Sequence, residues 1–143
     1  MEDDTIKLLR ECNAGIKMGI SSLDDVMEHV KDSTLENLLK KSKDTHCRLG
    51  DKTHDYLREY HDEGKEPAPM AKVMSWMKTN VKLGGEDSDR VVADLITDGC
   101  NMGVKSLYRY LHQYQAADEK VKKIAKEAID AEETLVNDMR EYL

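Results

Sequence analysis

The stretch STLENLLKKSKDTHCRLGDKTHDYLREY, from Ser33 to Tyr60, decides the fold. Its apolar and small residues recur every three or four positions, which is the spacing of one face of an α-helix. Ser33 and Glu36 have the spacing of a capping box, and Gly64 followed by Pro67 predicts the end of the helix. The inward stripe consists of Leu35, Leu38, Leu39, Ser42, His46, Leu49, Thr53, Tyr56, Leu57 and Tyr60.

The same spacing appears in three other long segments. Residues 6–30 precede the deciding stretch, and residues 92–114 and 121–139 follow it. Four amphipathic helices of similar length predict an all-α four-helix bundle. The connection over residues 64–88 is much longer than the other two. Its apolar residues predict a short helix: Met70, Val73, Met74, Met77 and Val81.

A connection of this length favours a crossover, in which the third long helix starts at the end where the second one starts. We therefore expect one domain over residues 1–143. A helical hairpin spans 1–63, the crossover spans 64–88, and a second helical hairpin spans 89–143.

Composition excludes several classes of protein. Charged residues make up 36% of the chain and the net charge is −7, which disfavours nucleic acid or an anionic membrane as a partner. No apolar run has the length needed to span a bilayer, and the acidic start Met1–Asp4 is unlike a signal peptide. Three widely spaced cysteines suit a reducing compartment, so we expect a cytoplasmic protein.

The two predicted hairpins resemble each other. CNAGIK at residues 12–17 matches CNMGVK at residues 100–105 in four of six positions, with an offset of 88. The second helices of the hairpins align with an offset of 86, which places His46 on Glu132. The two offsets together predict an internal duplication.

Several motifs resemble those of a known group. The sequence Ser75-Trp76-Met77, the stretch KLGG at residues 82–85 and the following Asp87 are similar to small bacterial proteins of the DUF2383 group. This group has unknown function and belongs to the ferritin-like superfamily. The resemblance covers the whole chain and implies a ferritin-like bundle of two hairpins joined by a long crossover.

Ferritin-like di-iron proteins place a Glu on two helices and a Glu-x-x-His on the other two. This sequence departs from that pattern. Cys12 stands where the first helix should offer a Glu, and the second helix has Asp44-Thr45-His46-Cys47. The last helix has Glu132 and Glu133 without a His three positions on. We therefore do not expect a di-iron site, nor ferroxidase or oxygenase activity.

One chemically interesting residue faces inward from each helix when the helices are projected at 100° per residue. These residues are Cys12, His46, Cys100 and Glu132. Two thiolates, an imidazole and a carboxylate would suit one zinc or iron ion. The favoured interpretation is that His46 and Glu132 pair with each other as a buried polar contact while the cysteines fill the core. The metal site, a redox pair of Cys12 and Cys100, and outward-facing solvated side chains are the alternatives.

The function predicted from these observations is non-enzymatic. A bundle without the di-iron ligands is expected to be vestigial as an enzyme and to act through association, as a homo-oligomer or with a protein partner. The broad apolar face of residues 92–114 and the methionine-rich connection are the expected contact surfaces. A mononuclear zinc or iron protein using Cys12, His46, Cys100 and Glu132 is the alternative.

Overall fold

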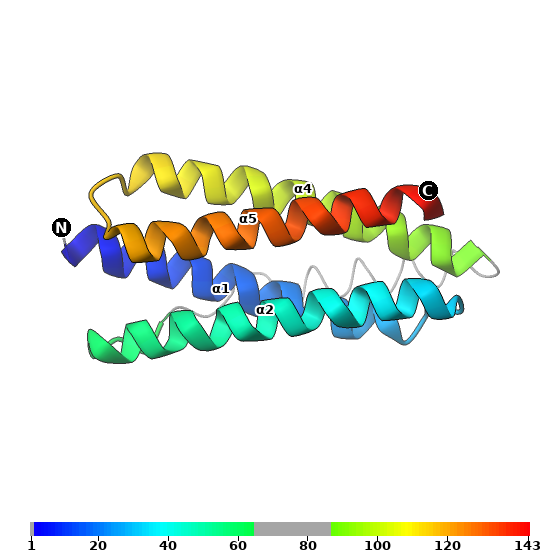
Figure 1. Cartoon of the computed structure of the whole chain (residues 1–143), viewed down its shortest axis with the longest axis horizontal. Helices are drawn as coiled ribbons and strands as arrows, with labels where there is room; N and C mark the ends of the chain where they lie inside the picture. Colours follow the sequence, from blue (N-terminus) through cyan, green and yellow to red (C-terminus); the bar gives the residue numbers. More distant parts are fainter. Residues whose placement is uncertain (1, 65–86) are drawn as a thin grey trace.

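The computed structural model describes residues 2–64 and 87–143 (Figure 1). These residues form four long helices and a short 3-10 helix, and the described part contains no strand, so the all-α prediction is confirmed. The elements are α1 (Glu2–Met27), α2 (Ser33–Glu59), α4 (Ser88–Gln113), α5 (Glu119–Met139) and η2 (Arg140–Tyr142). The short helix predicted between Met70 and Val81 lies outside the described residues.

Helix α2 begins one residue earlier than the capping box predicts. Its N-cap is Asp32, whose carboxylate accepts the backbone N–H of Leu35 at 2.9 Å. Asp32 has extended backbone geometry, as an N-cap residue requires. At the other end the chain leaves the helix through His61 and Gly64, both with positive φ. Gly64, at φ +85°, adopts this geometry without the steric cost that a side chain would bring.

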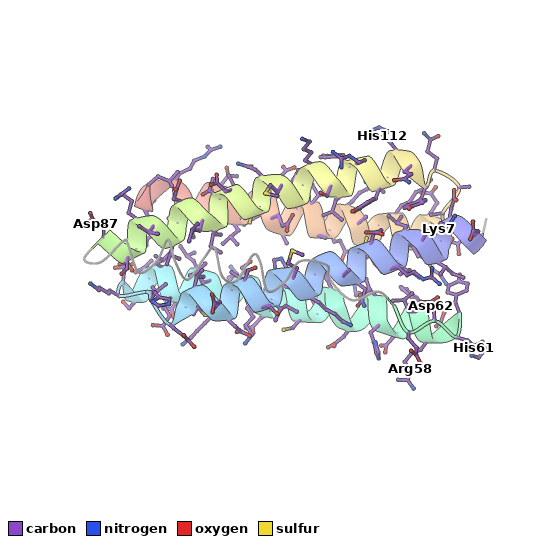
Figure 2. The ribbon with its side chains drawn as sticks, turned by 180° about the vertical axis from the view of Figure 1, so that it is seen from behind. Lys7, Arg58, His61, Asp62, Asp87 and His112 are labelled. Carbon is purple, nitrogen blue, oxygen red and sulfur yellow. The ribbon has the colours of Figure 1, made fainter. Side chains whose placement is uncertain are left out.

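The four helices pack as two hairpins side by side. Helix α1 pairs with α2 and α4 pairs with α5, while α2 also packs on α5 and α1 touches both helices of the second hairpin. Helices α2 and α4 start at the same end of the bundle and run in the same direction (Figure 1). Asp62, just after α2, and Asp87, just before α4, consequently lie at opposite ends (Figure 2).

The buried apolar residues form two separate clusters. The first, here called the Leu8 cluster, runs from Leu8 to Ile16 on α1 and includes Leu49 of α2 and Leu107 of α4. The second, the Leu35 cluster, contains Leu23 of α1, Leu35 of α2 and most of the buried residues of α4. On every helix, residues of the two clusters are separated along the chain, so the clusters occupy the two ends of the bundle.

Each hairpin turn is held by the first turn of a helix from the other hairpin. The backbone N–H of Asp32 donates to Asp89 Oδ2 at 3.0 Å, and the backbone N–H of Asp118 donates to Thr5 Oγ1 at 2.9 Å. The carboxylates of the two aspartates accept tyrosine hydroxyls, since Tyr142 donates to Asp32 at 3.1 Å and Tyr60 to Asp118 at 3.3 Å. The two ends of the bundle therefore repeat one pattern of contacts.

No described helix is both long enough and apolar enough to cross a membrane.

Candidate functional site

A layer of four residues separates the two apolar clusters. It consists of Gly19, His46, Gly103 and Glu132, one from each long helix. On α2, for example, His46 lies between Leu39 of the Leu35 cluster and Leu49 of the Leu8 cluster. The same order holds on the other three helices. We call these four residues the central layer.

His46 is buried and packed against α1. The side chain is 5% exposed, and its Nδ1 lies 2.8 Å from the backbone carbonyl oxygen of Ser42. Nδ1–H donates to that carbonyl, which leaves Nε2 as the acceptor of a neutral ring. Nε2 lies 3.2 Å from the point that a Cβ on Gly19 would occupy. Burial lowers the pKa of His46 because the charged imidazolium would lose its water.

Glu132 is packed against α4 in the same way. Its Cδ lies 2.8 Å from the point that a Cβ on Gly103 would occupy, so only glycine leaves room for the carboxyl group. Its Oε2 is buried and has no hydrogen-bond partner among the described residues. Burial raises the pKa of Glu132 to about 8, because an ionised carboxylate here would lose hydration without a compensating donor.

The two cysteines lie on opposite sides of the central layer. Cys12 belongs to the Leu8 cluster and Cys100 to the Leu35 cluster, and both are free thiols. Burial raises the pKa of each thiol to about 12, and the charge of Glu132 adds to the shift at Cys100. Cys100 is therefore near Glu132, while Cys12 lies on the other side of the central layer from Cys100.

The four residues singled out in the sequence are thus not brought together. Within residues 2–64 and 87–143, no group of three or more His, Cys, Asp or Glu side chains is placed to hold a metal ion. His46 and Glu132 share no hydrogen bond, because each packs on a glycine of its own hairpin. The separation of the two cysteines also leaves Cys12 and Cys100 without the geometry of a disulfide.

The contacts of the central layer revise the alignment of the two halves. Gly19 covers His46 as Gly103 covers Glu132, so the first helices correspond with an offset of 84. Thr5 and Asp89, which hold the two turns, give the same offset. The offset of 88 suggested by the cysteine motifs is one helical turn too long. The offset of 86 for the second helices agrees with the contacts, since Asp32 corresponds to Asp118.

The expected contact surface on α4 is largely used inside the bundle. Val92, Leu95 and Ile96 are buried, and Leu111 packs against the Leu8 cluster. Two large apolar side chains of α4 remain exposed, Met102 at 70% and Tyr108 at 48%. They are six positions apart and lie on different faces of the helix. Together they do not form a continuous apolar surface.

A groove that sequence reasoning missed runs along the outside of α2 and α5. It encloses about 430 Å³ and has Leu49, Ala131 and Leu135 among its lining residues. Charged side chains from both helices line it as well, including Lys52 and Glu127, which form an ion pair at 3.6 Å. Charged positions at steps of three and four residues on both helices are the signal that would have indicated it.

Comparison with known proteins supports the fold alone. No family model matches the chain, so the resemblance to the DUF2383 group has no support from that comparison, and no curated protein matches it either. A solved structure that is similar is the crystal structure of a DUF305 fragment from Deinococcus radiodurans, with a TM-score of 0.75. The match covers 96% of this chain and 93% of that one at 11% identity. An identity this low carries no information about a site.

Proposed function

We propose that the chain is a ferritin-like bundle that has lost the di-iron ligands and acts through association instead of catalysis. The observation that carries this proposal is the central layer. At the middle of the bundle, where a di-iron protein concentrates its ligands, the two ionisable side chains are each packed against a glycine. Neither one converges with two further ligands among the described residues.

The ferritin-like assignment draws on the direction of the helices. Helices α2 and α4 start at the same end, so the end of α2 and the start of α4 lie at opposite ends of the bundle (Figure 1). The turns of the two hairpins are held by equivalent contacts, which suits a pair of related hairpins. Both features accord with the arrangement that the sequence motifs imply.

Metal-based catalysis needs several ligands and an open position for substrate. His46 Nε2 faces α1 at a distance that leaves no space for an ion between the ring and Gly19. The carboxyl group of Glu132 is similarly closed in by Gly103. The side chains in the middle of the bundle therefore stabilise its packing, and the function lies on the outer surface.

The alternative is a protein that binds one zinc or iron ion. It retains support from the unpartnered Oε2 of Glu132 and from the proximity of Cys100 to that carboxyl group. Cys12 does not fit such a site, because it lies in the other apolar cluster. His46 would have to turn away from Gly19 to join it. Only Glu132 and Cys100 then remain as possible ligands among the described residues, and two ligands are fewer than a stable site requires.

Elemental analysis after reconstitution with zinc or ferrous iron decides between the two functions. We expect less than stoichiometric metal in the wild-type protein and no change in the Cys100→Ser and Glu132→Gln variants. Cys12→Ser is the matched control, since this thiol lies outside the possible site. One bound ion per chain, lost in the first two variants and retained in the control, would overturn the proposed function.

A further inference from the structure

The groove on α2 and α5 has a regular register. The two helices run in opposite directions (Figure 1). The ion pair between Lys52 and Glu127 places these residues at one level along the groove. Each step back along α2 is then matched by an equal step forward along α5. Lys41 accordingly lies at the level of Asp138, and both residues line the groove.

The charges of the groove are separated by helix. The lining residues of α2 include the basic side chains Lys41, Arg48 and Lys52. Those of α5 include the acidic side chains Glu127, Asp130 and Asp138. Leu49 and Leu135 also line the groove, but these side chains are only 1% and 3% exposed. The face is thus a basic row on α2 beside an acidic row on α5, over buried leucines.

Such a face is complementary to itself under one symmetry operation. A two-fold axis parallel to the groove carries α2 of one copy over α5 of another without any shift along the axis. Lys41 then faces Asp138 of the second copy, and Lys52 faces Glu127 of the second copy, because residues at one level stay at one level. A two-fold axis across the groove would instead place like charges opposite each other.

We propose that the α2–α5 groove is the interface of a symmetric homodimer. The inference rests on the proposed function, which it deepens by naming the partner and the surface. A second copy is favoured over another protein because it satisfies both charged rows at once and closes on itself. Each exposed ion pair contributes little by itself, so the interface draws on the pairing of both complete rows.

Charge reversal on one row tests the interface. Lys41→Glu with Arg48→Glu makes the groove predominantly acidic and leaves Lys52 as its basic residue. Asp130→Lys with Asp138→Lys makes it predominantly basic and leaves Glu127 as its acidic residue. In sedimentation velocity we expect the wild-type chain to be a dimer and each reversed variant to dissociate about 100-fold more readily. An equimolar mixture of the two variants restores a dimer, because acidic and basic grooves then face each other.

Two controls keep the result interpretable. Lys105→Glu with Arg109→Glu makes the same change in net charge on exposed positions of α4, and we expect this variant to remain dimeric. The chain with all four groove reversals regains both the contacts across its own groove and those of the dimer. It is expected to be folded by circular dichroism and dimeric, which separates loss of the interface from loss of the fold.

Three outcomes would overturn the inference. The first is a wild-type chain that stays monomeric at about 100 μM, well above a micromolar dissociation constant. The others are reversed variants that still form dimers, and a mixture of the two variants that does not recover the dimer. A monomer without bound metal would remove this surface and leave association with another protein as the function. Stoichiometric metal bound through Glu132 would instead remove the proposed function itself.

Discussion

The carboxyl group of Glu132 occupies the space that a side chain on Gly103 would fill, with its Cδ 2.8 Å from the position of the missing Cβ. The same relationship holds between His46 and Gly19 in the other hairpin. Each hairpin thus admits one ionisable side chain into its middle at the expense of a side chain on the facing helix. This arrangement predicts how stability depends on pH and on substitution at the glycines.

Glu132 makes stability fall as the pH rises. Its pKa in the folded chain, about 8, lies above the usual glutamate value of 4.5, so the folded state holds an extra proton between these limits. Stability is therefore lost progressively from about pH 4.5 to 8 and levels off above that range. In urea unfolding, the free energy of unfolding of Glu132→Gln is expected to rise relative to that of the wild type over this pH range, by a few kcal/mol at its upper end. A difference that does not change with pH would show that the carboxyl group is hydrated.

His46 acts in the opposite direction at lower pH. Its pKa in the folded chain lies below the usual histidine value of 6.5, so the unfolded chain takes up the proton first. Stability contributed by the neutral ring is present above pH 6.5 and is lost as the pH falls through the lowered pKa. We expect His46→Gln to lose less stability than the wild type between pH 6.5 and 5 in the same assay. Equal losses would contradict a buried neutral imidazole.

Substitution of Gly103 should displace Glu132. Alanine is the better helix former by about 1 kcal/mol, but its Cβ cannot coexist with the carboxyl group. Because Glu132 is flexible, we expect Gly103→Ala to push the carboxylate toward solvent and return its pKa to the usual range, seen as loss of the pH-dependent fall in stability. Gly99→Ala, with nothing within 4 Å of its Cβ, is the matched control. Gly99→Ala should increase the free energy of unfolding by about 0.5–1 kcal/mol and leave its pH dependence unchanged.

Gly19 should tolerate substitution less well. A Cβ there would lie 3.0 Å from His46 Cδ2, and the ring is held by its bond to the Ser42 carbonyl. Gly19→Ala is therefore expected to destabilise the chain by about 1–2 kcal/mol in thermal or urea unfolding. Gly15→Ala, one turn earlier with open space around its Cβ, is expected to be stabilising instead. If both variants behaved alike, the contact between His46 and α1 would be disproved.

Asp89 should contribute more to the free energy of unfolding than the other acidic residues of α4. Its carboxylate accepts the backbone N–H groups of Lys31 at 2.7 Å and Asp32 at 3.0 Å, which ties the first turn to the second hairpin. Asp89→Ala leaves two donors without their partner, so we expect a loss of about 1–3 kcal/mol in unfolding experiments. Asp94→Ala, an exposed change on the same helix, should cost less than about 0.5 kcal/mol. Comparable losses would mean that water replaces Asp89 in the variant.

The long helices were predictable because burial on one face imposes a regular spacing of apolar residues. The stripe of α2 is an example, since Leu35, Leu39, Leu49 and Leu57 are all buried. The inward direction of His46 and Cys100 followed from the same projection, and both are buried. Projection around a helix axis does not, however, give the height of a residue relative to its neighbours on other helices.

The position of each residue along the bundle axis explains why the expected site differs from the observed arrangement. Cys12 and Cys100 both face inward, yet one lies in the Leu8 cluster and the other in the Leu35 cluster. Their match in sequence suggested equivalent positions, while the glycine contacts show a shift of one turn. The register between helices depends on how all side chains pack at once, so a pair of similar motifs cannot reveal it.

The sequence by itself determined that this chain forms four long amphipathic helices, because the pattern of apolar residues along a helix is local information. Only the tertiary structure decided which residues meet. It placed Glu132 on Gly103 and His46 on Gly19, and it set the basic row of α2 beside the acidic row of α5. The physical reason is that the register and direction of the helices depend on packing between them. Contacts such as those at Gly19 and Gly103 set this register, and similar sequence motifs do not.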